Sequence, residues 1–490
     1  MGDELALTSA AALAREIRAG ERSPVDVVDY FLERIERHDD VNAFTATRAN
    51  EARAEARRAE KAVEAGENLG PLHGVPVALK DLFVWKDGLG NTFGSTPFTD
   101  FVPDESAIVT ERLERAGAIV IGTTNTCEFG HKGLTDNRVF GPTSTPFDLD
   151  RNAGGSTGGS TAAVGAGLVP LAVGEDGGGS IRIPAAWSGV YGLKPTFGRV
   201  PIRARPNGFQ LHTPFVHHGP QTRTVEDAAL MLDVVAGPHP DDPFSLPAEA
   251  DDSYLAAMRR SIADFDVAYS PHFGDFPVDQ RVLDVVGNAV RAFETAGATV
   301  DRLDFEFPYS HETITELWVD SFAVFYRELA HHLGEEGLPN LLERTNELCP
   351  QFAAKLERGR GVDAVDYKRN DVVRTGIFDA IQEVLTEYDL LVTPTVAVPP
   401  VENAANGQTL GPSEIDGEAV ERTIGFCLTH PLNFTGHPAA SVPAGVTDDG
   451  LPIGMQLIGS RFDEASILAA SGAVERVRPW DHHYEEILPN

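Results

Sequence analysis

Residues 153–199 combine two glycine-rich turns with an apolar segment, and this pattern limits the possible folds more than any other part of the sequence. Two turns rich in glycine and serine, at residues 154–160 and 177–180, enclose the apolar segment 161–173. The composition of that segment, which is broken by Pro170, predicts a helix followed by a buried strand. Glycine allows backbone conformations that other residues reach only with strain, and it lets the main chain approach a ligand closely. The sequence therefore predicts two tight turns on either side of a buried core segment.

The second turn has the residues that an acyl-transfer site needs. Three glycines run directly into a serine there, and they can direct several backbone N–H groups toward one point. That geometry holds a developing oxyanion beside a nucleophilic hydroxyl. We interpret Ser180 as a nucleophile whose own N–H, with those of Gly177, Gly178 and Gly179, forms an oxyanion hole.

Three alternative interpretations of these turns are weaker. Flexible linkers are not followed by apolar segments such as those at 181–187 and 189–195. A phosphate-binding loop requires a lysine that closes the glycine turn, and neither turn has one. Residues 154–158 match the G-x-S-x-G pattern, but that nucleophile elbow follows an apolar strand, and residues 147–152 are polar.

The order and spacing of these motifs resemble the amidase signature family. Residues 154–160 read GGSTGGS, residues 174–184 read GEDGGGSIRIP and residues 189–199 read GVYGLKPTFGR. The resemblance implies a Ser–cis-Ser–Lys triad. In that triad Ser180 is the nucleophile, and Ser156, in a cis peptide bond, relays the proton. The resemblance also implies that the triad lysine lies upstream.

The lysine that fits this pattern is Lys80. Residues 75–79 predict a short apolar strand directly before it, and Leu82 and Phe83 follow, so we expect its side chain to be drawn inward. Burial disfavours the charged ammonium and lowers the pKa of a lysine, and the neutral amine can then accept a proton as a general base. Residues 74–81, GVPVALKD, also resemble the family pattern.

Charged residues surround the expected nucleophile. Asp176 and Arg182 flank it, and we expect them to position its loop through an ion pair or hydrogen bonds rather than to act in the chemistry. Glu175 stands where the family often has Thr or Ser, and it therefore adds a charge near the site.

The resemblance implies an α/β fold in which a large mixed, twisted β-sheet is sandwiched between layers of helices. We expect a single domain over residues 1–490, because the matching segments come from both ends of the chain. Its expected parts are N-terminal helices at 1–70, a signature core at 71–235, a divergent helical insert at 236–384, and a C-terminal return to the core at 385–490. In the insert, Trp318, Phe322 and Phe325 fall on one helical face, which favours helix core over a substrate wall.

The charge balance limits the partners of this chain. Its 40 basic and 74 acidic side chains give a formal charge of −34, which argues against nucleic acid or acidic membranes as partners. No stretch has the length of a membrane span, and the first residues lack the pattern of a signal peptide, so we expect a cytoplasmic protein. A high-salt cytoplasm and a GC-rich coding bias explain the acidic, Lys-poor composition equally well.

Cysteine and histidine spacings lead us to expect no cofactor and no metal. The three cysteines lie far apart, and we expect buried, unreactive thiols. Histidines occur as adjacent pairs at 217–218, 331–332 and 482–483. Neighbouring side chains on a helix or strand point apart, and no carboxylate or cysteine spacing completes a zinc site.

We predict an amidase that hydrolyses a carboxylic amide C–N bond through an acyl-enzyme on Ser180 and releases ammonia or an amine. The alternative is the A subunit of a tRNA-dependent Asp/Glu amidotransferase, a glutaminase that shares this core. The segment after residue 365 lacks the Tyr-Tyr stretch that we associate with that subunit, which favours the first prediction. A binding protein that keeps only the fold is disfavoured because Lys80, Ser156 and Ser180 are intact. Aryl amides, aliphatic amides, carbamates and lactams stay open as small-molecule substrates, and the resemblance allows a homodimer.

Overall fold

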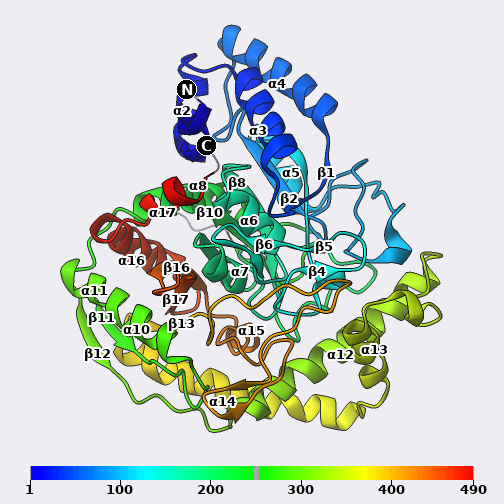
Figure 1. The fold of residues 1–490 in the computed structure, drawn as a ribbon, viewed down its shortest axis with the longest axis vertical. Helices are drawn as coiled ribbons and strands as arrows, with labels where there is room; N and C mark the ends of the chain where they lie inside the picture. The colour runs from blue at the N-terminus through cyan, green and yellow to red at the C-terminus, as the bar shows by residue number, and fades with distance from the viewer. Residues whose placement is uncertain (1, 248–252, 489–490) are drawn as a thin grey trace.

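A computed structural model describes residues 2–247 and 253–488 of the chain (Figure 1). Its N-terminal part contains the helices α1 (Gly2–Leu7), α2 (Ala10–Arg18), α3 (Pro24–His38) and α4 (Ala49–Glu64). The start of α3 follows from its sequence, because the hydroxyl of Ser23 accepts hydrogen bonds from the N–H groups of Val25 and Asp26. Pro24, which has no N–H to satisfy, occupies the first turn.

One large mixed sheet organises the described part of the chain. Its eleven strands lie in the order β1 (Phe44–Thr47), β3 (Ile119–Thr124), β2 (Pro76–Lys80), β8 (Leu171–Asp176), β10 (His217–Thr222), β9 (Tyr191–Lys194), β16 (Ala439–Val446), β17 (Pro452–Gly459), β13 (Leu390–Pro394), β11 (Asp266–Tyr269) and β12 (Thr299–Arg302). β2 runs parallel to both β3 and β8, whereas β10 runs antiparallel to β8 and β9. The predicted α/β class with a large mixed sheet is confirmed.

Helices surround this sheet (Figure 1). They are α5 (Ile108–Arg115), α6 (Gly158–Gly165), α7 (Arg182–Trp187), α8 (Val225–Val235), α9 (Tyr254–Ala257), α10 (Gln280–Ala289), α11 (Arg291–Thr295), α12 (His311–Glu335), α13 (Pro350–Arg360), α14 (Ala364–Glu387), α15 (Leu432–Thr435), α16 (Glu464–Val477) and α17 (His482–Ile487). Short strand pairs form β4 (Asp136–Asn137) with β5 (Gly141–Pro142), β6 (Ser144–Thr145) with β7 (Asp148–Asn152), and β14 (Glu414–Ile415) with β15 (Glu418–Ala419).

The segment between the two glycine turns adopts the predicted elements. α6 is followed by β8, and every residue of both is buried. β2 covers the apolar run that ends at Lys80, and all five of its residues are buried. The register pairs Val77 with Leu171 and Leu79 with Val173, so two fully buried strands lie side by side in the middle of the molecule.

The segment 236–384 differs from the helical insert that the sequence predicts. It contains β11 and β12, which extend the sheet at the edge beyond β13. Val267 and Ala268 of β11 pair in parallel with Leu390 and Leu391 of β13, so these short strands complete a sheet whose other members come from distant parts of the chain. Because each strand has only four residues, strong helical patterns on both sides hide it in the sequence.

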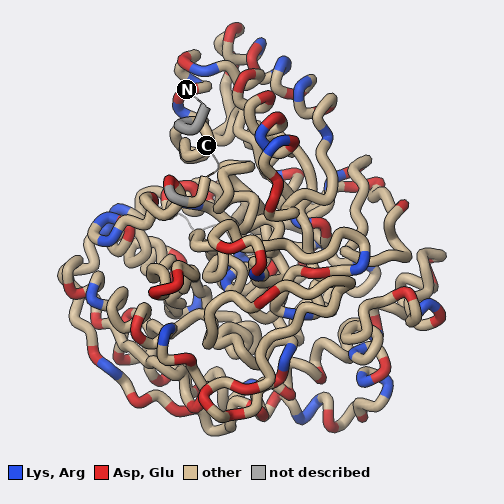
Figure 2. The backbone as a smooth tube through the Cα atoms, in the orientation of Figure 1, with Lys and Arg blue, Asp and Glu red and all other residues tan. Residues whose placement is uncertain are grey.

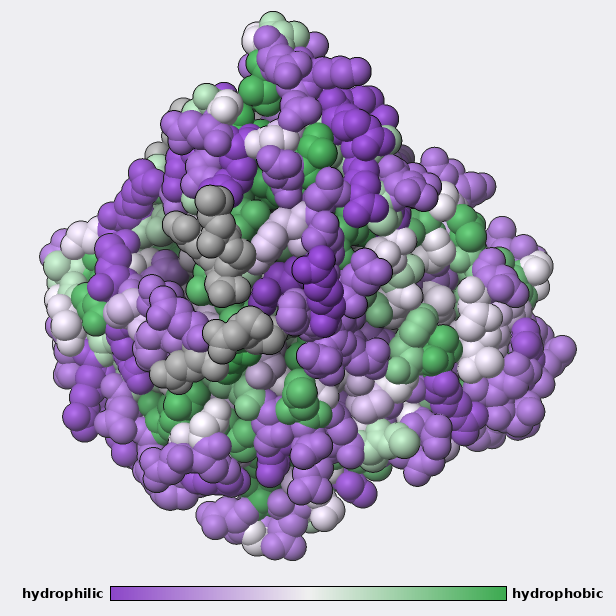
Figure 3. Space-filling view, turned by 45° about the horizontal axis from the view of Figure 1, so that its top comes forward, coloured by the Kyte–Doolittle hydropathy of each residue, from purple (hydrophilic) through white to green (hydrophobic). Residues whose placement is uncertain are grey.

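Asp and Glu positions are spread around the outline of the molecule (Figure 2), and hydrophilic residues dominate the face shown in Figure 3. Cys127, Cys349 and Cys427 are buried and unpaired, as predicted. Within residues 2–247 and 253–488, no helix combines the length and apolar character that crossing a membrane requires.

Candidate active site

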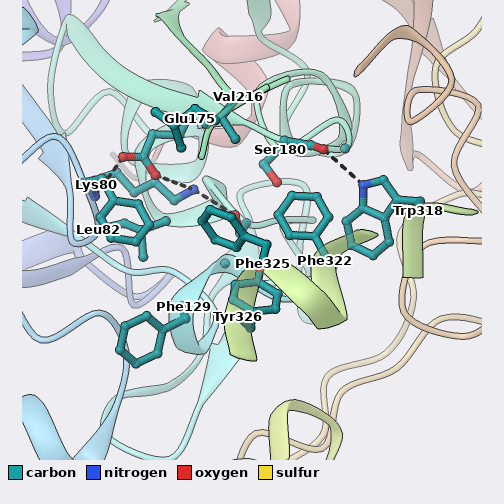
Figure 4. A pocket seen from close by; sticks show the side chains of 16 residues that line it. Lys80, Leu82, Phe129, Glu175, Ser180, Val216, Trp318, Phe322, Phe325 and Tyr326 are labelled. Atoms are coloured by element: carbon teal, nitrogen blue, oxygen red, sulfur yellow. Dashed lines mark hydrogen bonds and ion pairs between the residues drawn. The ribbon is translucent and has the colours of Figure 1, made fainter. Parts of the chain in front are cut away.

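The site forms where two parallel strands end. Lys80 is the last residue of β2, and β8 ends at Asp176, directly before the glycine turn at 177–180. Since β2 and β8 pair in parallel, their carboxyl ends lie at the same edge of the sheet. Figure 4 shows that Lys80 and Ser180 face one cavity there, and Ser156 lines the same cavity. The structure thus brings together the three predicted residues.

Lys80 and Ser156 are in direct contact. The Nζ of Lys80 donates to the Oγ of Ser156 at 2.8 Å, and the lysine side chain is fully buried. Burial lowers the pKa of Lys80, against the opposing effect of the negative charge of Glu175. The peptide bond between Gly155 and Ser156 is cis, as the resemblance implied. Gly155 leaves no room for a side chain, because a Cβ there would lie 2.4 Å from the carbonyl carbon of Leu134.

Ser180 lies beside this pair but is not hydrogen bonded to it. Its hydroxyl lines the same cavity, and its carbonyl oxygen accepts a hydrogen bond from the N–H of Thr157 at 3.3 Å. Among the described residues, no hydrogen bond joins the hydroxyls of Ser180 and Ser156. Catalytic hydrogen bonds are often long or poorly aligned without a substrate, so this gap is compatible with a proton relay.

The glycine turn is held by its carbonyl oxygens. The Nε1–H of Trp318 donates to the carbonyl of Gly177 at 3.0 Å, and the Oγ1 of Thr429 donates to the carbonyl of Gly178 at 2.7 Å. In a trans peptide the C=O and the following N–H point in opposite directions. The N–H of Gly178 is therefore directed away from Trp318.

One predicted oxyanion donor is used elsewhere. The N–H of Gly179 donates to the Oδ1 of Asp176 at 2.7 Å, so in this structure it does not point to an oxyanion. This differs from the prediction that all three glycines contribute. In the described part of the chain, the N–H groups of Gly177, Gly178 and Ser180 have no hydrogen-bond partner.

Asp176 and Arg182 form a buried ion pair under this turn. The Nε and Nη2 of Arg182 donate to the two carboxylate oxygens of Asp176 at 3.0 and 2.9 Å. Burial alone would raise the pKa of Asp176, but the charge and hydrogen bonds of Arg182 outweigh it and hold that pKa well below its ordinary value. The remaining N–H groups of Arg182 donate to Gln456, Asn433 and the carbonyl of Thr429. The pair therefore ties the nucleophile loop to the C-terminal part of the chain.

Aromatic side chains from α12 form the opposite wall. Trp318, Phe322, Phe325 and Tyr326 line the cavity, together with Phe129 (Figure 4). The sequence favoured helix core over a substrate wall for the first three, and they are buried core residues that also line the cavity. A second cavity, of about 200 Å³, continues from this wall. The two cavities share Phe83, Phe129, Leu211, Val216 and Phe325.

Sequence reasoning missed Lys355, which packs against the Trp318 ring of this aromatic wall. Lys355 lies on α13, its Nζ is 4.3 Å from the centre of the Trp318 ring, and it donates to the carbonyl of His131 at 2.6 Å. Burial lowers the pKa of Lys355 to about 8. No local pattern around residue 355 indicates this role, because the contact depends on the packing of α13 against α12 (Figure 1).

Outside the cavity, Asp275, His311 and Glu312 place one ligand atom each within 4.8 Å of one another. Each ring nitrogen of His311 lies 3.6 Å from one of the two carboxylates. A histidine paired with two carboxylates accounts for this arrangement without an ion. None of the three adjacent histidine pairs belongs to it.

Comparison with known proteins places the chain in a family. The model of the family described as Amidase matches residues 26–468. An acylamidase from Rhodococcus erythropolis is 37% identical to this chain, over 96% of each protein. The chain belongs to the amidase signature family.

Relatives of this amidase include both kinds of enzyme that the sequence predicted. The A subunit of the glutamyl-tRNA(Gln) amidotransferase from Geobacillus thermodenitrificans (strain NG80-2) is 34% identical, over 95% of this chain and 96% of the relative. The crystal structure of a bacterial aryl acylamidase superposes with a TM-score of 0.95 at 38% identity, and it covers 99% of both chains. A 6-aminohexanoate cyclic dimer hydrolase superposes with a TM-score of 0.87 at 27% identity, over 99% of this chain and 100% of the other. This amidase therefore hydrolyses amide C–N bonds, and the acylamidases resemble it more closely than the amidotransferase subunit does.

Proposed function

We propose that this amidase acts through an acyl-enzyme on Ser180, with Ser156 as proton relay and Lys80 as general base. The observation that carries this proposal is the 2.8 Å contact between Lys80 Nζ and Ser156 Oγ, in the cavity that Ser180 also lines. A serine hydroxyl is a weak nucleophile and needs an adjacent base. A lysine buried beside two serines supplies one, because burial favours its neutral amine.

In the first half of the reaction, the neutral amine of Lys80 takes the proton of Ser156, and Ser156 takes the proton of Ser180. The Oγ of Ser180 then forms a bond to the amide carbonyl carbon, and the carbonyl electron pair moves to oxygen. The free N–H groups of Gly177, Gly178 and Ser180 stabilise this oxyanion. When the C–N bond breaks, the amine leaves with a proton returned through Ser156.

In the second half, a water molecule replaces the amine. It gives a proton through the same relay to Lys80, and its oxygen attacks the acyl carbon. The bond between that carbon and Ser180 Oγ then breaks, the serine recovers a proton, and the carboxylic acid is released. The ion pair of Asp176 and Arg182 keeps the turn in place during both halves and exchanges no proton with the substrate.

We further propose that the substrate is a small-molecule amide with an aromatic group. Phe322 and Phe325 of α12 face Ser180 across the cavity, and rings pack favourably against such a wall (Figure 4). The adjoining cavity of about 200 Å³ offers further apolar space. The structural similarity to an aryl acylamidase supports the same substrate class. The A-subunit alternative would require glutamine, a polar substrate for which this aromatic wall offers no matching charge.

Hydrolysis of a chromogenic nitroanilide tests the mechanism and the substrate class together. We expect Ser180→Ala, Ser156→Ala and Lys80→Ala each to lower kcat by about 1,000-fold or more. Ser471→Ala removes a buried hydroxyl that contacts Tyr191 outside the cavity, and it serves as the matched control with native activity. We expect the anilide to be preferred to acetamide in kcat/KM. Full activity of Ser180→Ala would refute the mechanism, and a preference for acetamide or glutamine would refute the substrate class.

A further inference from the structure

Glu175 is a buried carboxylate on the wall of the active-site cavity. It is the residue before Asp176 near the end of β8, and its side chain is 4% exposed. It lines the same cavity as Lys80, Ser156 and Ser180 (Figure 4). Burying a carboxylate is costly unless it is paired or hydrogen bonded. The groups that contact Glu175 therefore indicate its role.

The contacts of Glu175 fix it against the catalytic lysine. The N–H of Phe83, three residues after Lys80, donates to its Oε1 at 2.7 Å. Its Oε2 lies 3.8 Å from the Nζ of Lys80. On the neighbouring strand β10, His218 is its direct cross-strand partner, and the Nε2 of that histidine lies 3.6 Å from Oε1. The backbone therefore holds one oxygen while the other is directed to the lysine.

The other ionisable groups around Lys80 are less able than Glu175 to stabilise its charged ammonium form. Burial raises the pKa of the Cys127 thiol and of the Tyr326 hydroxyl, so both stay neutral near pH 7. Asp176 is already paired with Arg182. Facing Lys80 or Glu175 are Asp176 from β8, Cys127 from the segment after β3, His218 from β10 and Tyr326 from α12. Among these groups, Glu175 is the carboxylate without an arginine partner.

We propose that Glu175 is a positioning residue that sets the base strength of Lys80. Its carboxylate stabilises the ammonium that forms when Lys80 takes the proton of Ser156, and its contact with Phe83 holds that charge at a fixed distance. This inference rests on the proposed function, because it assigns Lys80 the role of base. It adds a residue that acts through the lysine and does not touch the substrate carbon.

The two effects on Lys80 oppose one another. Burial lowers the pKa of the lysine and favours the neutral amine, and the charge of Glu175 raises that pKa. A base of very low pKa accepts a proton weakly, so the rate falls even when the base is fully deprotonated. Glu175 therefore moderates the effect of burial and keeps the amine basic enough to deprotonate Ser156.

The pH dependence of kcat/KM in Glu175→Gln tests this inference, because glutamine keeps the shape and an acceptor for the N–H of Phe83. We expect the acid limb of the profile to move down by about one pH unit, because an opposite charge near the lysine is lost. We expect the plateau at high pH to fall about threefold to tenfold, because the base is weaker. The pH dependence of labelling by a fluorophosphonate should shift in the same way. An acid limb that stays in place would overturn the inference.

Two further variants control this test. Glu128→Gln removes a buried carboxylate that binds Ser95 and the N–H of Cys349 and is not among the groups that act on Lys80, so its acid limb should match the native one. Glu175→Asp keeps the charge but withdraws it by one methylene, and its acid limb should lie between the native and Glu175→Gln limbs. If Glu175→Gln does not fold, an unchanged limb in Glu175→Asp overturns the inference. Activity retained by Lys80→Ala would instead refute the proposed function itself.

Discussion

The indole Nε1–H of Trp318 donates to the carbonyl oxygen of Gly177 at 3.0 Å, across 141 positions of sequence. The contact joins α12 to the turn that carries Ser180, so one aromatic residue both forms the cavity wall and orients the peptide that ends in the N–H of Gly178. Little space separates the two elements, because a Cβ on Gly178 would lie 2.4 Å from the same Nε1.

Replacing Trp318 by Phe should therefore lower kcat more than it raises KM. Phenylalanine keeps an aromatic wall but loses the N–H, so the Gly177 peptide can rotate and misdirect the oxyanion donor. We expect kcat to fall by about 10-fold to 100-fold. Steady-state kinetics with a nitroanilide measures the effect.

The control for this change is Trp480→Phe. Trp480 is buried and donates its Nε1–H to the carbonyl of Arg223, away from the cavity. The Trp480→Phe variant also loses an indole N–H, but one that does not contact the glycine turn. We therefore expect it to keep the native kcat. Equal kcat values for the two variants would show that the indole N–H of Trp318 has no role in orienting the turn.

Replacing Arg182 by Met should destabilise the whole chain. Methionine leaves the carboxylate of Asp176 buried without its charge partner, and we expect the free energy of unfolding to fall by about 3–5 kcal/mol. Urea denaturation measures the loss. Adding Asp176→Asn in the same chain removes the unpaired charge and should recover part of the stability. A loss below about 1 kcal/mol would mean that water or another cation satisfies Asp176.

Much of the site could be predicted because its signals are local. The apolar run of β2 and the following Leu82 and Phe83 show that Lys80 is drawn inward, and the triple-glycine turn marks Ser180. The turn at 154–160 holds two serines, and the resemblance to the family selects Ser156. Local sequence also gives the helix and strand between the turns. These features need no knowledge of how distant segments pack.

The remaining features depend on packing between distant segments. Amphipathic spacing shows that Phe322 and Phe325 face inward, but it does not show that α12 crosses the end of β8. Three consecutive glycines have similar conformational freedom, so the sequence cannot indicate that the N–H of Gly179 binds Asp176 while its neighbours stay free. β11 is a strand because it pairs with β13, which lies far along the chain, and β12 in turn pairs with β11.

Stability should decrease in acid partly because of His430. Burial lowers the pKa of this histidine from 6.5 to about 3, so the unfolded chain binds a proton in a range where the folded chain does not. Its contribution to stability is complete above about pH 6.5 and is lost as the pH falls toward 3. Between these two pH values, we expect His430 to contribute about 1.4 kcal/mol per pH unit to the dependence of the unfolding free energy on pH.

Urea denaturation at several pH values between 7 and 4 checks this assignment. His430→Asn cannot take up the proton, so its unfolding free energy should depend less steeply on pH than that of the native chain. Asparagine keeps a polar amide at this buried position but is shorter than the ring, whose Nε2 lies 3.3 Å from the Oγ1 of Thr315. Parallel curves for the two proteins would assign the acid sensitivity to other groups.

The intact mass of the protein after incubation with a fluorophosphonate shows whether Ser180 is the nucleophile. This probe forms a covalent bond with an activated serine, so it reports the nucleophile without requiring knowledge of the substrate. We predict one adduct on the native chain, located on Ser180, no adduct on Ser180→Ala, and strongly slowed labelling of Lys80→Ala. An adduct that persists in Ser180→Ala, or full hydrolytic activity of that variant, would contradict the account.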